Sequence, residues 1–425
     1  MIKDALKSMK NDLSGSIFYW LTFVLSSMFI LLFFHLSYSD TVGVTFINSE
    51  NNMKTFMAVI VIAMCMIVIF FTNDFYVKKK AKELSVRLVC GSTYASLVMF
   101  LLCQTLFLFI LAIPVGMVLA VIGMPFVNYL LVNVLKSEFY IALNADAFVS
   151  TFIIIAVEIG WCTFVNLGFT YRSSIKNLMD GEKGYFKSSL RLPVVFSGKT
   201  KMYVSLAAYL LPLVIFYMLE KETTGIFIFS IVGMIGMYNC FESVFVPYLR
   251  DKVENKYIED PFKVVSLGFL RHNCIILKNN IVLLVTSDII LIGVLVSCIN
   301  ESVDVMIAMI SFVVINVLLT FALMFKFSSE LMYRKPIYES LRRIGYLDEQ
   351  LNKIMKDEVF LLYFFVSVLC LLYIINIFVV LMIHSLLDMR LIVGMIIAFI
   401  VPVIICALMN YRYYRKVVLG GKKNV

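Results

Sequence analysis

Acidic side chains inside long apolar stretches are the first candidates for chemistry in this sequence. Glu158 falls near the middle of the stretch AVEIGWCTFVN, and Asn166 lies on a nearby turn. Asp288 and Glu242 lie in two other apolar stretches, Glu242 close to one end. Ionisable groups are costly in hydrocarbon, so such positions mark candidate functional sites. These residues either line a polar cavity for a substrate or lipid headgroup, or form interhelical hydrogen bonds that fix packing, which is the more common role.

The other reactive residue types form no pattern typical of a metal or catalytic site. The nine cysteines have no paired spacing, and the three histidines are scattered along the chain. The stretch PVVFSGKT (193–200) ends like a phosphate-binding loop, but Pro193 stands where such a loop needs glycine. The sequence therefore predicts no metal site, no resident cofactor, no ATPase motif and no enzyme activity.

The elements that must position these residues are long apolar helices. The chain of 425 residues is 61% hydrophobic and 15% charged, with a mean hydropathy of +0.94. Crossing a hydrocarbon core takes about 20 residues as a helix, and only a helix pairs all of its own backbone groups in lipid. We therefore predict an all-α integral membrane protein with about ten spans. The predicted spans lie near 16–38, 55–75, 94–122, 147–171, 203–219, 224–246, 280–298, 304–326, 358–383 and 391–411.

Lysine and arginine are distributed unevenly between the two sides of these spans. With both termini inside, most basic residues fall in cytoplasmic segments, and the external loops keep only Lys54, Lys136, Lys221 and Arg390. This asymmetry predicts a multi-pass protein of the cell membrane with cytoplasmic N- and C-termini. It also accounts for the net charge of +9, so no nucleic-acid partner is expected, whereas membrane lipid is.

An internal repeat organises the chain. In the cytoplasmic stretch after the second span, Arg87 precedes Gly91, and Gln104 follows the glycine by thirteen residues. After the eighth span, Gly345 is preceded by Arg342 and followed at the same interval by Glu358. We predict two four-helix repeats with the same orientation, 1–172 and 270–425, the second with a basic cytoplasmic tail. A cytoplasmic linker and two-helix insert, 173–269, joins them.

The stretch KELSVRLVCGST, which contains Gly91, predicts a short amphipathic helix along the inner membrane surface. Such a helix would bury Leu84, Val86, Leu88 and Val89 and expose Lys82, Glu83 and Arg87 to water. Gly91 and Gly345 are expected to take the left-handed conformation that ends a helix and turns the chain into the next span. A helix of this kind that continues a membrane span can transmit movement.

The run E-x-x-x-R-x-x-x-G, formed by Glu83, Arg87 and Gly91, resembles the coupling segment of FtsX-like ABC transporter permeases of the MacB and FtsX superfamily. The ten predicted spans are most similar to those of the Bce-type antimicrobial-peptide transporter permeases. Family members usually carry glutamate where this chain has Gln104, and Glu358 matches that pattern. The chain departs from the Bce-type in lacking a large extracellular domain, since the loop between the seventh and eighth predicted spans is only CINESV.

The resemblance implies a transporter subunit whose ATP is bound by a separate ABC ATPase, present in two copies. It implies that the two cytoplasmic segments contact that ATPase through Lys82, Glu83, Arg87, Gly91, Arg342, Arg343, Gly345 and Tyr346. The expected function is coupling of ATP hydrolysis to movement or release of an amphipathic substrate, an antimicrobial peptide or a lipid-linked compound, in peptide-antibiotic resistance. One alternative is a signalling protein that relays the ATPase state to a sensor histidine kinase or a cell-wall enzyme. Another is an ion-coupled secondary transporter.

Overall fold

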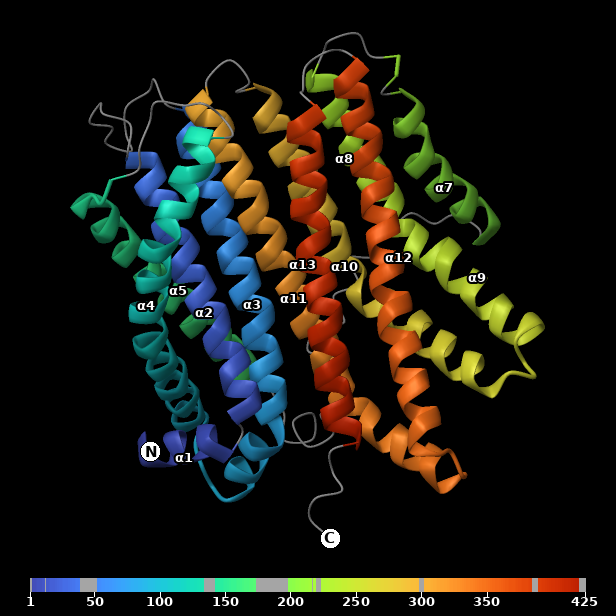
Figure 1. Cartoon of the computed structure of the whole chain (residues 1–425). Helices are drawn as coiled ribbons and strands as arrows, with labels where there is room; N and C mark the ends of the chain where they lie inside the picture. The colour runs from blue at the N-terminus through green and yellow to red at the C-terminus, as the bar shows by residue number, and fades with distance from the viewer. Residues whose placement is uncertain are drawn as a thin grey trace. The chain divides into compact units, whose positions relative to one another are not determined.

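The computed structural model describes residues 2–11, 13–38, 52–133, 142–172, 198–215, 217–218, 223–297, 302–383 and 389–419. These residues form helices and no strand (Figure 1). The α-helices are α1 (Ile2–Asn11), α2 (Leu13–Tyr38), α3 (Asn52–Val89), α4 (Tyr94–Asn133), α5 (Ala145–Arg172), α7 (Gly198–Ile215), α8 (Thr223–Cys240), α9 (Val246–Asp251), α10 (Pro261–Ser297), α11 (Ser302–Arg343), α12 (Asp348–Ile383) and α13 (Met389–Leu419). Two π-helical turns, η2 (Phe241–Phe245) and η3 (Lys252–Lys256), flank α9.

The predicted fold class, an all-α membrane protein, is confirmed. Each predicted apolar segment overlaps a helix, and seven helical stretches among the described residues are long and apolar enough to cross a membrane. The described parts of α2 and α3 hold shorter apolar stretches, Tyr19–His35 and Ile62–Asp74. The count of ten spans stays a prediction. Several helices also run well past their apolar parts, because their polar ends keep good helix formers such as lysine, glutamate and leucine.

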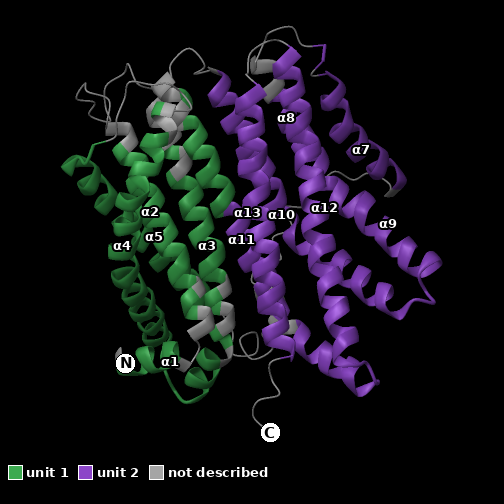
Figure 2. Cartoon of the chain, viewed as in Figure 1, with its two compact units in different colours: residues 1–190, 301–318 green, residues 191–300, 319–425 purple. Residues whose placement is uncertain are grey.

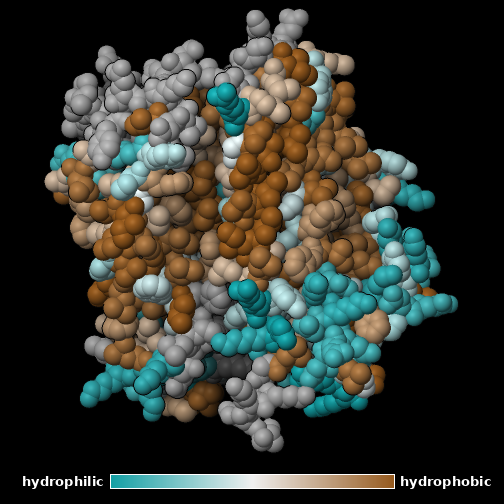
Figure 3. Space-filling view, viewed as in Figure 1, coloured by the Kyte–Doolittle hydropathy of each residue, from teal (hydrophilic) through white to brown (hydrophobic). Residues whose placement is uncertain are grey.

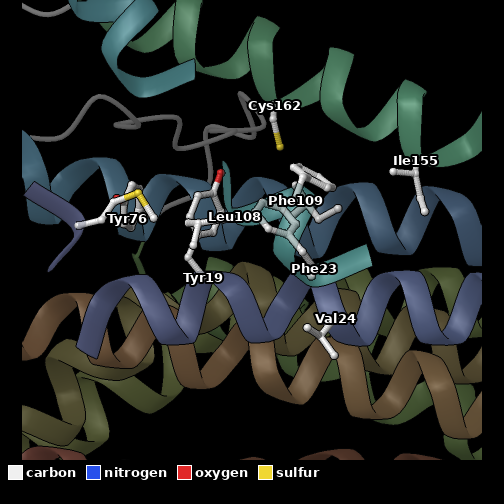
Figure 4. Close-up of a cluster of buried hydrophobic side chains, with 11 residues drawn as sticks. Tyr19, Phe23, Val24, Tyr76, Leu108, Phe109, Ile155 and Cys162 are labelled. Carbon is white, nitrogen blue, oxygen red and sulfur yellow. The ribbon is translucent and has the colours of Figure 1, made fainter. Parts of the chain in front are cut away.

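The chain divides into two compact units (Figure 2). Unit 1 comprises residues 1–190 and 301–318, and unit 2 comprises 191–300 and 319–425. In unit 1, α2 packs against α3, α4 and α5, and α1 lies across the lower ends of α2 and α4 in Figure 1. The core of this bundle combines aromatic and aliphatic side chains (Figure 4). Tyr19 stacks on Tyr76 with ring centroids 4.6 Å apart, and Phe23 stacks on Phe109 at 3.7 Å.

In unit 2, α10 is the central element and packs against α8, α9 and α12, while α12 packs against α13. The helices α7 and α8 approach closely at Gly236, where an added methyl group would lie 2.4 Å from the backbone nitrogen of Tyr209. Small residues permit this packing in membranes. Figure 3 shows apolar residues along the middle of α12 and α13 and hydrophilic residues gathered towards their lower ends. This pattern is typical of helices that leave the hydrocarbon core and enter water.

Candidate functional site: two helical hairpins and the polar networks beneath them

Two helical hairpins carry the residues expected to couple to an ATPase. The first hairpin is residues 80–104, where α3 turns into α4, and the second is residues 334–358, where α11 turns into α12. Both α3 and α11 run unbroken from their apolar segments into the hairpin. Gly91 has φ +90° and Gly345 has φ +109°, so the predicted left-handed conformation is confirmed at both glycines.

The same hydrogen bonds close both turns. In the first hairpin, Gly91 N–H donates to the carbonyl of Leu88 and Ser92 N–H to that of Arg87, each at 3.0 Å. In the second hairpin the equivalent amides donate to carbonyls three and five residues back, at 3.0 and 3.1 Å. This pair of bonds is the Schellman motif, which satisfies carbonyls that a helix end leaves unpaired. The hairpins are therefore locally closed turns.

The next helix begins at equivalent positions in the two hairpins. Thr93 caps α4, and its hydroxyl oxygen accepts the Ser96 N–H at 3.3 Å. At the start of α12, Leu347 donates its backbone N–H to the side-chain oxygen of Gln350 at 3.0 Å, which is half of a capping box. Different residue types thus complete the same turn. This explains why the two stretches resemble each other in spacing more than in sequence.

At the tip of the first hairpin, the expectation that Glu83 and Arg87 face water holds only in part. The two side chains are about one-third exposed and form an ion pair at 3.2 Å, and the Arg87 guanidinium lies 4.0 Å from the centre of the Phe100 ring. Leu84 is buried as predicted, but Val86 and Val89 are 61% and 66% exposed. The side chain of Lys82 lies outside the described residues. The exposed surface of this tip is therefore more apolar than the sequence suggested.

The tip of the second hairpin repeats this combination. Arg342 pairs with Asp348 at 3.0 Å, and Arg343 is exposed. The Tyr346 ring makes an edge contact with a phenylalanine at the start of α10. Ile344 and Leu347 are 76% and 65% exposed. Large apolar side chains thus project from both tips.

Beneath the second hairpin lies a buried polar network centred on Glu358. This carboxylate is fully buried, pairs with Arg334 and accepts a hydrogen bond from Asn273 at 2.9 Å. Tyr414 donates to its other oxygen at 2.9 Å, and the Tyr338 hydroxyl lies 2.8 Å from that of Tyr414. Arg334 also donates to Asn273. The network therefore joins α10, α11, α12 and α13 within unit 2.

The equivalent network beneath the first hairpin is built around Gln104 and Lys80. Gln104 accepts a hydrogen bond from Tyr76 at 3.0 Å and donates to the Ala5 carbonyl at 3.2 Å. The buried Lys80 ammonium donates to the hydroxyl and the carbonyl of Ser8 at 2.8 and 2.9 Å. Ser8 in turn donates to Glu83 at 2.5 Å, and Glu83 lies 3.5 Å from Lys80. This network joins α1, α3 and α4 within unit 1.

The two networks correspond position by position, but the carboxylate that pairs with the buried cation lies at a different position in each. Lys80 and Arg334 are 254 residues apart, as are Gln104 and Glu358, and both cations are buried. In the second network the carboxylate is Glu358. In the first network the residue at that position is an amide, and the carboxylate is Glu83, whose equivalent in the second hairpin is Ile337. Each buried cation thus has one carboxylate partner.

Two buried asparagines make similar contacts on the last helix of each unit's bundle, although they are 244 and not 254 residues apart. Asn166 on α5 accepts a hydrogen bond from Asn73 on α3 at 2.9 Å. Asn410 on α13 accepts one from Ser328 on α11 at 2.8 Å. Each amide nitrogen then donates to a hydroxyl group, on α4 in the first case and on α12 in the second. Asn166 was a predicted site residue, and its contacts are interhelical hydrogen bonds.

The remaining acidic candidates do not share one environment. Glu158 is buried in α5 and accepts a hydrogen bond from Ser26 at 2.6 Å, while its second oxygen has no hydrogen-bond partner among the described residues. Asp288 is fully buried in α10. Glu242 lies in the π-helical turn η2 and is about two-fifths exposed, paired with Lys278. Within the described part of the chain, no cluster of three or more metal-ligating side chains is present.

Several residues of the networks went unrecognised in the sequence, and one signal would have found two of them. Arg334 precedes Glu358 by 24 residues, and Lys80 precedes Gln104 by the same interval. Extending the repeat backwards along the chain would therefore have paired the two cations. No sequence signal marks Asn273 and Tyr414, because their role depends on how α10 and α13 pack.

A scan of the chain against protein-family models finds no match, and a search of curated proteins finds none either. Its function is therefore inferred from its own residues and geometry.

Proposed function

We propose that this chain is the membrane subunit of an ABC transporter, built as two FtsX-like four-helix repeats (1–172 and 270–425) with a two-helix insert between them. The two hairpins receive two copies of a separate ABC ATPase on the cytoplasmic side of the cell membrane. Closure of the ATPase dimer then moves the membrane helices and drives export or release of an amphipathic substrate such as an antimicrobial peptide or lipid-linked compound.

The observation that carries this proposal is the shared architecture of the two hairpin tips. Each tip continues a membrane helix without interruption and ends in the same hydrogen-bonded turn. Each also presents apolar side chains beyond the apolar segment of its helix, Val86 and Val89 in one case and Ile344 and Leu347 in the other. Exposed apolar patches with charged neighbours are typical of protein-binding surfaces.

The buried networks support the same proposal because they tie each hairpin to its own bundle. Arg334 and Glu358 join the two arms of the second hairpin, and Asn273 adds α10 to them. In the first hairpin, Lys80 and Gln104 both bind α1. A displacement of either tip is therefore passed to several helices at once. The correspondence between the networks also supports the repeat.

The test is affinity purification of the tagged chain from its native membrane. An ABC ATPase should co-purify at about two copies per chain, and its hydrolysis rate should respond to the chain. Val89→Asp with Ile344→Asp should abolish this recovery, because both tips lose apolar contact area and gain a charge that must be desolvated. Ile258→Asp is the matched control, since Ile258 is 70% exposed and lies outside both hairpins. The proposal fails if no ATPase co-purifies with the chain. It also fails if the Val89→Asp and Ile344→Asp variant still co-purifies with the ATPase.

A further inference from the structure

A pocket of about 310 Å³ opens where α1, α2 and α4 meet in unit 1. Its walls are mostly apolar side chains, among them Leu6 of α1, Ile17 of α2 and Leu111 of α4. Lys10, Ser16 and Trp20 also line it. The volume falls at the lower end of the range for small-ligand sites, about 300–1,000 Å³.

The helix that forms one wall is amphipathic and basic. Lys3, Lys7 and Lys10 are exposed and recur at helical spacing along α1, against one exposed acid, Asp4. The apolar part of α2 begins directly after α1, so α1 lies at the boundary between hydrocarbon and water. Tryptophan is enriched at this depth in membrane proteins. Within the described part of the chain, no carboxylate lies within ion-pair distance of Lys10.

From this geometry we infer that the pocket binds an anionic phospholipid. The apolar walls receive an acyl chain, and Lys10 at the pocket receives the phosphate-bearing headgroup. A zwitterionic lipid satisfies the walls equally well but brings a cation of its own to a stretch, residues 1–12, that holds three lysines against two aspartates. Charge complementarity therefore selects an anionic lipid.

The site has a structural connection to the first hairpin. Leu6, Met9 and Lys10 of α1 line the pocket, whereas Ala5 and Ser8 of the same helix bind Gln104 and Lys80. A lipid in the pocket therefore holds the helix to which the first hairpin is tied. This inference depends on the membrane location of the chain and not on the proposed ATPase partner.

The chain contains two tryptophans, Trp20 and Trp161, which permits a direct test by fluorescence quenching. In the Trp161→Phe variant, Trp20 at the pocket is the only tryptophan, and excitation at a wavelength that tyrosine does not absorb selects its emission. The purified variant is placed in phosphatidylcholine vesicles holding a minor fraction of brominated phosphatidylglycerol or, in parallel, brominated phosphatidylcholine. Brominated phosphatidylglycerol should quench Trp20 with a relative affinity about fivefold higher, which is about 1 kcal/mol for one lysine near an anionic surface.

Two lysine variants and a variant that keeps only Trp161 test whether the lipid preference is specific to the pocket. Lys10→Gln should remove the preference for the anionic lipid, while Lys7→Gln should keep it, because Lys7 shares the helix but does not line the pocket. In the reciprocal Trp20→Phe variant, Trp161 is 41% exposed on α5 and should be quenched equally by the two lipids. Equal quenching of Trp20 by both lipids, or equal effects of the two lysine variants, overturns the inference.

Discussion

Lys80 and Arg334 are buried cations that reach their carboxylates by different routes. Arg334 pairs across the second hairpin with Glu358 on α12, whereas Lys80 pairs along α3 with Glu83 and reaches α1 through Ser8. Burying a charge without a partner costs several kcal/mol, so each network needs one acid but not at a fixed position. A substitution that removes one acid can therefore be offset by an acid at the other position.

We expect Glu358→Gln to destabilise the protein by about 3–5 kcal/mol, because it leaves the buried Arg334 without a carboxylate. Adding Ile337→Glu should restore part of this loss. It places an acid three residues after Arg334, as Glu83 follows Lys80, and residues three apart on a helix are neighbours. Thermal unfolding of the purified chain in detergent measures both effects.

Ile337→Gln added to Glu358→Gln is the control, because it changes the size and polarity of residue 337 without adding charge. Equal stability of the two double variants would show that an acid at position 337 cannot replace Glu358, and would contradict this account.

At the scale of elements, each hairpin depends on a single residue with positive φ. An added Cβ at Gly91 or Gly345 would meet no atom within 4 Å, so space does not restrict either position. The restriction is the backbone conformation, which costs an L-residue about 1–2 kcal/mol. The glycine therefore stabilises the turn and not the packing around it.

Gly91→Ala and Gly345→Ala should each loosen their own turn. The amide hydrogens of Ser92 and Tyr346 close these turns, so their exchange with solvent should accelerate roughly 5- to 30-fold, as expected for 1–2 kcal/mol. Hydrogen–deuterium exchange with mass spectrometry measures this. Gly394→Ala in α13, where φ is ordinary and no atom crowds the position, should leave both tips unchanged. Unchanged exchange at the tips of the first two variants would contradict this account.

At the scale of the whole molecule, the side of the membrane on which the hairpins lie decides whether an ATPase can reach them. The distribution of basic residues predicts that both hairpins lie in the cytoplasm. Cys90, next to Gly91, is exposed and free, whereas the other described cysteines are buried or half-buried. The chain therefore carries its own reporter for the location of the first tip.

A membrane-impermeant maleimide should label Cys90 in inside-out vesicles and not in intact cells. Cys90→Ser should remove this labelling, which assigns the signal to the tip. Bound ATPase should protect Cys90, because Val86 and Val89 beside it belong to the proposed contact surface. Labelling in intact cells that the Cys90→Ser variant loses would place the first hairpin outside and exclude a cytoplasmic partner.

The fold was accessible from sequence because its signals are local. Long apolar runs predict membrane helices, and Gly91 and Gly345 predict the two turns, since only a few residue types tolerate positive φ. The helix lengths were harder to predict, because α3 and α11 continue through their lysine and arginine clusters without a break.

The site was less accessible because its contacts join distant parts of the chain. Glu358 and Gln104 were recognisable by their spacing from glycine, but nothing in the sequence assigns Asn273, Tyr414 or Ser8 to them. From the sequence alone, Glu83 and Arg87 resemble a solvent-exposed ion pair on one face of a helix. Only the packing of α1 and α4 against α3 shows that they are half-buried.

The unbroken course of α3 has a mechanical consequence. Its 38 residues span about 57 Å, of which the hydrocarbon core accounts for about 30 Å. With neither glycine nor proline within it, α3 is a stiff lever that carries a tilt of its inner end to its outer end. The corresponding helix of the second hairpin, α11, contains Pro336, which removes a backbone hydrogen bond and makes the helix easier to bend at that point. If an ATPase presses equally on both tips, we expect the larger displacement of membrane helices to pass through α3.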